Sequence, residues 1–201
     1  MTESNHQDQN HYEDDFIAFL ELMWGEGYLS PGGAAEVGRL LAGSDLVGKT
    51  VLDIGCGSGG ITAALVKEYG AAHVVGIDVE EPVCHHARAM INSLGVADQV
   101  DIQLVPPGHP IPLPNESFDI VFSKDSIVHI PDKEALSQDA YRLLKPGGRF
   151  VASDWLIGHD GEPSPEMVDY IKREDLGFGM ASPKRYLNLC LHTIQVHSTH
   201  S

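Results

Sequence analysis

From Lys49 onward the sequence alternates short apolar runs with helical patterns, and this alternation restricts the fold more than any other feature. The apolar runs have the length and the β-branched content of buried strands: KTVLDI, HVVGID, QVDIQLV, FDIVFS and RFVASDW. Helical patterns follow three of them: ITAALVKEY, PVCHHARAMINSL and DKEALSQDAYRLL, the last stopped by Lys145-Pro146-Gly147-Gly148. Strands that alternate with helices need right-handed crossovers, so we predict an α/β fold with a doubly wound, mostly parallel sheet.

The charge balance excludes two classes of partner. Thirteen Lys and Arg residues stand against 29 Asp and Glu, which gives a formal net charge of −16. Nucleic acids and anionic membranes bind basic surfaces, so we expect neither as a partner. No apolar run approaches the roughly 20 residues that span a bilayer, and the N-terminus lacks a secretory signal. The three scattered cysteines (Cys56, Cys84 and Cys190) suit a reducing compartment, so we expect a cytoplasmic protein.

A glycine-rich turn joins the first predicted strand to its helix. Gly55, Gly57 and Gly60 satisfy the G-x-G-x-x-G spacing, which lets a ligand approach a helix N-terminus closely and is compatible with a dinucleotide. The acid just before this turn, Asp53, would repel a pyrophosphate but suits an ammonium group, such as that of S-adenosylmethionine. A second acid, Asp78, ends the next strand and can accept ribose hydroxyls of either cofactor.

In combination, these segments resemble class I S-adenosylmethionine-dependent methyltransferases. The resemblance runs from about Lys49 to Trp155 and rests on four motifs: VLDIGCGSGG, VVGIDVE, FDIVFSKDSIVHI and LLKPGGRFVASDW. It implies a Rossmann-like fold and S-adenosylmethionine as the cofactor. A narrower resemblance, in HYEDDFIAFLELMWGEGYLSPGG and FSKDSIVHIPDK, is to phosphoethanolamine N-methyltransferases and their bacterial relatives, in which an N-terminal helix and loop cover the cofactor as a lid.

The resemblance and the patterns together imply four segments. We expect a disordered leader over residues 1–10, a helical lid over 11–43, the cofactor-binding α/β domain over 44–160, and a helical extension with a truncated sheet edge over 161–201. Apolar residues at helical spacing place one lid helix at 14–24, and a second follows near 34–41.

Functional residues carry over from this family by position. The residue chemistry and the resemblance together predict the following cofactor-site residues: Leu29, Ser30, Asp53, Gly55, Gly57, Asp78, Val79, Gly108 and Lys124. The resemblance places Asp125 beside the acceptor and gives Tyr12 and His129 catalytic roles, and we also expect Trp155 and Tyr170 to contact the acceptor.

Chemistry supports some of these assignments independently. An imidazole just after a strand, such as His129, can take a proton from an ammonium substrate, because only the neutral amine has a lone pair for methyl attack. Its alternative role is to cap a loop. A tyrosine before a helix, such as Tyr12, commonly serves only in packing.

The sequence departs from the family pattern at several positions. Leu20 and Leu176 replace tyrosines, and Glu174 stands where an arginine holds phosphate, next to Arg173. Pro106-Pro107-Gly108 stands where an acid receives the adenine amino group, so only backbone groups can contact that edge. One basic cluster can hold a phosphate, although solvated helix faces explain it equally well: Lys172, Arg173, Lys184 and Arg185.

We therefore predict an S-adenosylmethionine-dependent methyltransferase (EC 2.1.1) that acts on a small amine, phosphoethanolamine or a related N-acceptor. Two alternatives remain open: a truncated fragment that binds the cofactor without turnover, and an NAD-dependent oxidoreductase. A metal site is not expected, because no histidine or cysteine pair with ligand spacing is supported by a second pair.

The end of the chain leaves the predicted sheet incomplete. Two helical stretches, EPSPEMVDYIKRED and SPKRYLNLCL, use most of the residues after Trp155, and HTIQVHS is the sole strand candidate there. A fifth strand without its usual neighbour would expose unpaired backbone groups. We accordingly expect low stability or a homodimer formed across that edge.

Overall fold

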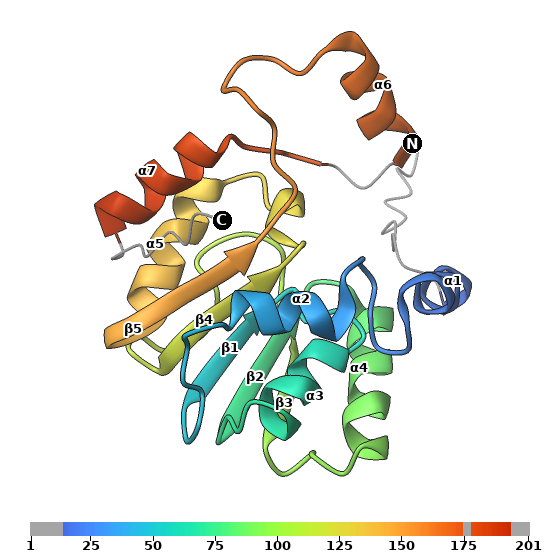
Figure 1. The fold of residues 1–201 in the computed structure, drawn as a ribbon, viewed down its shortest axis with the longest axis vertical. Coiled ribbons are helices and arrows are strands. Elements are labelled where there is room, and N and C mark those ends of the chain that lie inside the picture. Colours follow the sequence, from blue (N-terminus) through green and yellow to red (C-terminus); the bar gives the residue numbers. More distant parts are fainter. Residues whose placement is uncertain (1–13, 175–177, 194–201) are drawn as a thin grey trace, which may run out of the picture.

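The computed structural model describes residues 14–174 and 178–193 and contains one parallel sheet (Figure 1). Its strands lie in the order β3-β2-β1-β4-β5, and every neighbouring pair is parallel. Their bounds are β1 (Thr50–Ile54), β2 (His73–Asp78), β3 (Val100–Leu104), β4 (Phe118–Lys124) and β5 (Leu144–Ser153). The predicted α/β fold with a doubly wound sheet is confirmed.

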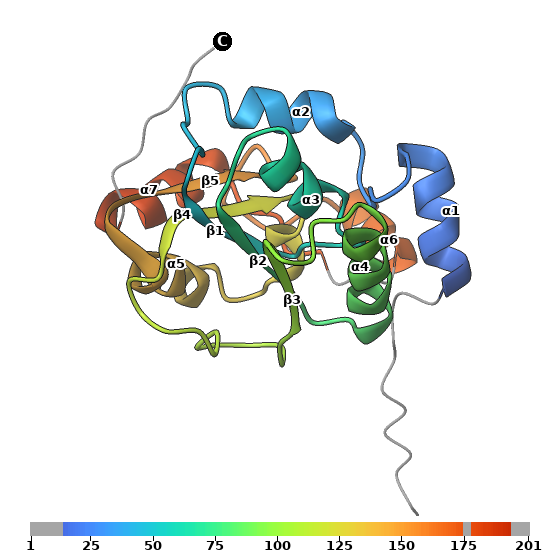
Figure 2. The same cartoon turned by 90° about the horizontal axis from the view of Figure 1, so that it is seen from below.

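Helices cover both faces of the sheet (Figure 2). One layer contains α2 (Gly33–Leu40), α3 (Gly60–Lys67) and α4 (Glu81–Ser93), and the other contains α5 (Lys133–Leu143) and α7 (Pro183–Thr193). The switch falls between β1 and β4, because the chain leaves β1 toward β2 and later returns to the other side of β1. Ligands of open α/β sheets bind at such a switch point, outside the carboxyl ends of the strands.

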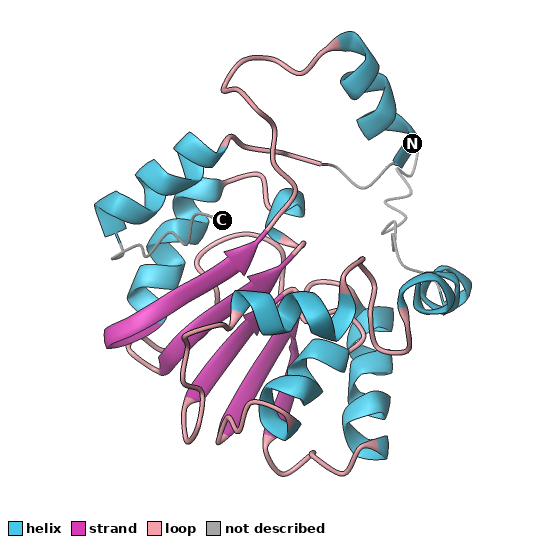
Figure 3. Cartoon of the chain, viewed as in Figure 1, coloured by secondary structure: helices cyan, strands magenta, loops and turns pink. Residues whose placement is uncertain are grey.

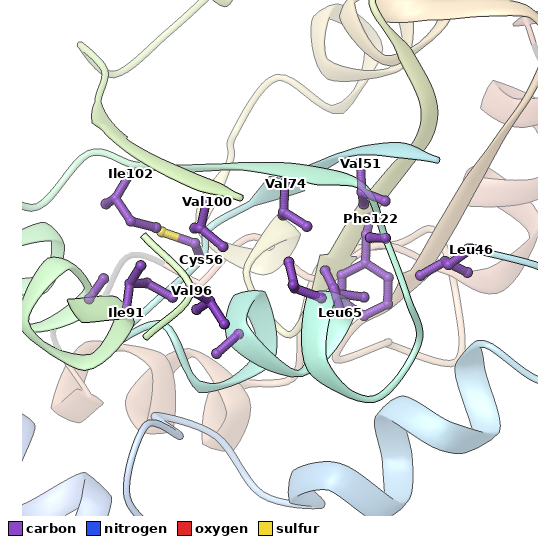
Figure 4. Close-up of a cluster of buried hydrophobic side chains, with 14 of the residues drawn as sticks. Leu46, Val51, Cys56, Leu65, Val74, Ile91, Val96, Val100, Ile102 and Phe122 are labelled. Carbon is purple, nitrogen blue, oxygen red and sulfur yellow. The ribbon is translucent and has the colours of Figure 1, made fainter. Parts of the chain in front are cut away.

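Each layer has its own hydrophobic core. Val51 and Phe122 project toward α3, where they pack with Leu65 in the cluster of Figure 4. The next residue along β1, Leu52, projects to the opposite face and packs in the cluster that contains Leu136 of α5. Successive strand residues point to opposite faces, so a strand buried on both sides needs a continuous apolar run. This requirement explains the sequence pattern that predicts the strands.

Two further helices lie outside these layers. The N-terminal helix α1 (Asp14–Trp24) has the predicted bounds and buries Ile17. Helix α6 (Pro165–Glu174) stands away from the sheet, on loops that rise above the carboxyl ends of the strands (Figure 3). No described helix is long and apolar enough to cross a membrane.

The structure corrects the boundary between α5 and β5. The predicted stop after α5 is instead the start of β5, which begins at Leu144 without an intervening turn. Phe118 pairs with Leu144, but Ile120 already pairs with Arg149, so the extra residues form an irregularity in the ladder. A positive φ of 80° at Gly147 fits this bulge.

At the C-terminal end of the described chain, the predicted tail strand HTIQVHS is wrong in its first two residues. His192 and Thr193 end α7 rather than begin a strand, and the rest of HTIQVHS lies outside the described residues, as does the leader 1–10. Within the described chain, β5 pairs with β4 alone among the strands. The truncated sheet edge and the dimer expected from it both stay predictions.

Candidate functional site

The glycine turn after β1 folds back onto the end of β2. The backbone N–H groups of Gly55 and Cys56 both donate to the Ile77 carbonyl, at 2.9 and 3.0 Å. Gly55 has a φ of 72°, and a Cβ at this position would collide with the Ser126 side chain, which follows β4. Glycine is therefore required here by both conformation and space. The turn brings the ends of β1, β2 and β4 together.

Asp53 lies beneath this turn and is 2% exposed. Burial raises the pKa of its carboxyl to about 7; the hydrogen bond from Thr62 opposes this rise, and the charge of Asp78 adds to it. The Thr62 hydroxyl donates to Asp53 Oδ2 at 2.7 Å. A carboxyl with this pKa changes charge near neutral pH, and a cation bound nearby would favour the ionised form.

Asp78, at the end of β2, already accepts three backbone hydrogen bonds. Gly57 N–H donates to Oδ2 at 3.1 Å, while Val79 and Glu80 donate to Oδ1 at 2.8 and 3.2 Å. A carboxylate has about four acceptor positions. A ligand that offers two hydroxyls must therefore displace at least one of these backbone donors. The neighbouring residue, Val79, is 48% exposed.

The loop between α1 and α2 rests on the glycine turn. Gly60 N–H donates to the Gly27 carbonyl at 3.0 Å, and a Cβ added at Gly60 would lie 2.5 Å from that oxygen. Leu29 covers the turn, since a Cβ at Gly57 would come 3.5 Å from Leu29 Cδ1. The last glycine of the G-x-G-x-x-G spacing is thus required by this lid contact. Sequence reasoning missed the role of Gly27, because the contact joins segments far apart in the chain.

Lys124 ends β4 and has a side chain that is 1% exposed. Its ammonium donates to Ser30 Oγ at 2.9 Å and to the Pro31 carbonyl at 2.7 Å, both in the lid loop. It also pairs with Asp125 at 2.5 Å and with Glu36 of α2 at 3.2 Å. We refer to these five residues as the Lys124 cluster. Three of them were predicted site residues, whereas Glu36 and Pro31 were not.

Asp125 adopts a left-handed backbone conformation, with a φ of 56°. In a non-glycine residue this conformation destabilises the folded state, and it persists only where surrounding contacts hold the backbone in place. Its N–H donates to the Ser153 carbonyl at 2.9 Å, and its carboxylate contacts Lys124. These contacts hold the carboxylate at the carboxyl edge of the sheet, where the resemblance places the acceptor amine.

His129 belongs to the short 3-10 turn η1 (Ile127–His129), and a buried lysine supports this turn. The Lys133 ammonium donates to the carbonyls of Ile127 and Ile130, both at 2.6 Å. Lys133 is 3% exposed, and burial lowers the pKa of its ammonium. The motif that predicts His129 gave no role to Lys133, which bonds to the turn from α5.

Two more contacts fix the same turn from the C-terminal segment. Val128 N–H donates to Asp154 Oδ1 at 3.0 Å, and the Val128 carbonyl accepts from Gly179 N–H at 2.7 Å. The Tyr186 hydroxyl of α7 donates to the other Asp154 oxygen. Burial raises the pKa of Asp154, and its hydrogen bonds oppose that rise.

Aromatic rings lie beside His129. The Phe178 ring centroid is 5.1 Å from that of His129 and 6.4 Å from that of Tyr170. The structure thus connects Tyr170 to His129 through Phe178, which sequence reasoning missed. Trp155 follows β5 and is 53% exposed.

Other predicted residues are not brought to this group. Gly108 lies in the loop between β3 and β4, where a Cβ would meet nothing within 4 Å. Tyr12 and Leu176 lie outside the described residues. Of the predicted basic cluster, Arg185 is engaged with both carboxylate oxygens of Glu134, at 2.8 and 2.9 Å. In the described ranges, no three His, Cys, Asp or Glu side chains converge as metal ligands would.

Comparison with known proteins identifies the fold and the family. A family model described as a methyltransferase domain matches residues 45–172. A solved structure of phosphoethanolamine N-methyltransferase 2 from Haemonchus contortus, with phosphomonomethylethanolamine and S-adenosylhomocysteine, superposes with a TM-score of 0.82 at 28% identity. It covers 92% of this chain and 43% of that one. Phosphoethanolamine N-methyltransferase 1 from Zea mays is 35% identical over 167 residues, which are 83% of this chain and 32% of the maize protein.

The parallel sheet, the glycine turn and the two strand-end acids define a class I S-adenosylmethionine-dependent methyltransferase domain. The chain belongs to the methyltransferase-domain family. It spans about a third of the length of the plant relatives that it matches, and 62% of a Plasmodium falciparum phosphoethanolamine N-methyltransferase that is 29% identical.

Proposed function

We propose that this chain transfers a methyl group from S-adenosylmethionine to the nitrogen of a small amine. The observation that carries the proposal is that the residues expected to hold the cofactor and the segment leading into the His129 turn meet at one edge of the sheet. Gly57 N–H donates to Asp78 Oδ2 at 3.1 Å, and a Cβ at Gly55 would collide with the side chain of Ser126, just before η1. His129 therefore belongs to a segment that begins beside the glycine turn expected to hold the cofactor.

The residues of this chain supply positioning and a proton acceptor. When bound, S-adenosylmethionine supplies an electrophilic methyl group on a sulfonium. Asp53, Asp78 and the glycine turn would hold it, with Leu29 covering the turn. Asp125 would attract the acceptor ammonium, and His129 would take its proton. The freed lone pair then forms the C–N bond as the C–S bond breaks, and S-adenosylhomocysteine leaves.

The acceptor is proposed to be an amine of the phosphoethanolamine type or an unphosphorylated relative. The similarity to phosphoethanolamine N-methyltransferases supports the first. The engagement of Arg185 with Glu134 and the position of Glu174 favour the second, because a phosphate needs an available cation.

A methyl-transfer assay tests the proposal. Purified protein is given S-adenosylmethionine with phosphoethanolamine, ethanolamine or their N-methyl derivatives, and S-adenosylhomocysteine is quantified. We expect turnover with at least one amine, seen as formation of S-adenosylhomocysteine above that of a reaction without acceptor.

Substitution of His129 tests the mechanism. His129→Ala should cut turnover by about 10²-fold or more, the usual contribution of a general base. It should leave S-adenosylhomocysteine affinity nearly unchanged by calorimetry. His159→Ala, at an exposed histidine, is the matched control. Wild-type turnover in His129→Ala would exclude the role, and cofactor binding without turnover on any amine would favour the impaired-fragment alternative. Binding of NAD in place of S-adenosylhomocysteine would favour an oxidoreductase.

A further inference from the structure

The Lys124 cluster joins the lid to the acceptor side of the site. An ammonium has three hydrogens, and four oxygens surround this one at 2.5–3.2 Å. Three of those oxygens belong to lid residues, namely Ser30, Pro31 and Glu36, and the fourth belongs to Asp125. With a side chain 1% exposed, Lys124 depends on these partners, because a buried charge without them is strongly destabilising.

The lid turn is shaped to reach this ammonium. Gly32 has a φ of 92°, and a Cβ there would collide with the Glu36 carboxylate. The glycine therefore lets the Glu36 side chain fold back over the turn toward Lys124. Ser30 and Pro31 approach the same ammonium from the residues just before Gly32.

Other polar attachments of the lid are weaker or neutral. The Asp14–His86 contact is 3.3 Å long, and the Asp14 side chain is 80% exposed, so solvent screens it. The bond from Gly60 N–H to the Gly27 carbonyl is a neutral backbone hydrogen bond. Among the ion pairs of the described residues, the Lys124–Glu36 pair joins the N-terminal segment to a buried group of the sheet.

We propose that Lys124 is a positioning residue that holds the lid loop closed over the cofactor site and fixes the Asp125 carboxylate at the same time. Cofactor entry and exit then require the Lys124–Glu36 pair and the bonds to Ser30 and Pro31 to break. Asp125 keeps its orientation only while Lys124 is held. The inference rests on the cofactor of this family and not on the acceptor, so it can be tested without turnover.

The test measures the kinetics of S-adenosylhomocysteine binding by surface plasmon resonance. Glu36→Gln keeps the size of the side chain but removes its charge, and Ser30→Ala removes one acceptor. We expect both variants to release S-adenosylhomocysteine faster, by about tenfold for Glu36→Gln, as the loss of a charge-assisted bond implies. Association should accelerate as well, so the equilibrium affinity should change less than the dissociation rate. Asp15→Asn, which removes an exposed charge from the lid helix, is the matched control and should keep wild-type rates.

A charge-compensated pair distinguishes lid release from misfolding. Lys124→Met leaves two facing carboxylates, whereas Lys124→Met with Glu36→Gln removes one of them. We expect the double variant to release S-adenosylhomocysteine fast. Its midpoint of thermal unfolding should lie above that of Lys124→Met alone. If Lys124→Met fails to fold, the S-adenosylhomocysteine dissociation rates of Glu36→Gln and Ser30→Ala test the inference instead.

Wild-type dissociation rates in Glu36→Gln and Ser30→Ala would overturn the inference and leave the proposed methyl transfer standing. Conversely, faster release in these variants together with no turnover on any amine would support the inference and count against the proposed function.

Discussion

At the scale of single residues, the site depends on carboxylates whose environments differ. Asp53 is enclosed and has a pKa raised to about 7, whereas Asp125 is held by an ammonium and by a strained backbone. Asp78 already accepts three backbone hydrogen bonds. Because S-adenosylmethionine is a cation, an acid that ionises near neutral pH beside its binding turn links cofactor affinity to pH.

We predict that Asp53 makes the protein less stable as the pH rises from about 4 to about 7. The folded pKa of about 7 lies above the ordinary carboxyl value of 3.8, so between these two pH values the folded state holds more protons than the unfolded state. Stability from this group is therefore fully present at low pH and is lost as the pH passes through the folded pKa. Above it, no further change from Asp53 is expected.

The measurement is urea unfolding at several pH values for wild type and Asp53→Asn. The difference in their free energies of unfolding should fall across this window, because the amide cannot titrate. S-adenosylmethionine affinity of the wild type should rise over the same range and level off. Parallel stability curves for the two proteins would show that Asp53 titrates as an ordinary carboxyl.

At the scale of elements, the sequence predicts what local patterns determine. The strands and the helices α1 and α4 can be predicted from the spacing of apolar residues along the sequence. Burial on one or two faces of an element imposes this spacing. The strand-end acids Asp53 and Asp78 were predictable for the same reason. The start of β5 was not, since its proline and glycines resemble a stop while pairing with β4 decides the outcome. Likewise, Glu36 and Lys133 gain roles only from contacts across the fold.

We predict that Lys133 positions η1 and thereby His129. Lys133→Met removes the donors to Ile127 and Ile130 while keeping an apolar chain of similar length. Leaving buried carbonyls without donors costs about 1–3 kcal/mol, so the thermal midpoint should fall. Turnover should fall too. The affinity for S-adenosylhomocysteine should stay unchanged, because the hydrogen bonds of Lys133 go to η1 and not to the glycine turn.

Steady-state kinetics and calorimetry on the same preparation check this prediction. Lys67→Met, at an exposed lysine of α3, is the control for loss of one positive charge. If cofactor affinity and turnover fall together, Lys133 stabilises the whole domain rather than the His129 turn.

At the scale of the whole molecule, charge and an unpaired edge act against each other. Within the described residues, β5 pairs with β4 alone among the strands, and an edge of this kind favours pairing with another strand. Each copy carries a formal charge of −16, so two copies repel each other. Salt shortens the range of this repulsion, to about 10 Å at 0.1 M and about 3 Å at 1 M.

We therefore predict a homodimer formed across β5, with a fraction that rises with ionic strength. Size-exclusion chromatography with light scattering, at low and high salt, measures that fraction. Ala152→Lys places a charge on an exposed position of β5 and should restore the monomer, because charged side chains block edge pairing. Ala18→Lys, the control, adds the same charge at an exposed position of α1 and should have the same dimer fraction as the wild type.

A monomer at every salt concentration, with unaltered stability, would mean that this edge is protected without a partner strand. Equal dissociation by both lysine variants would instead assign the salt dependence to net charge and place the contact elsewhere.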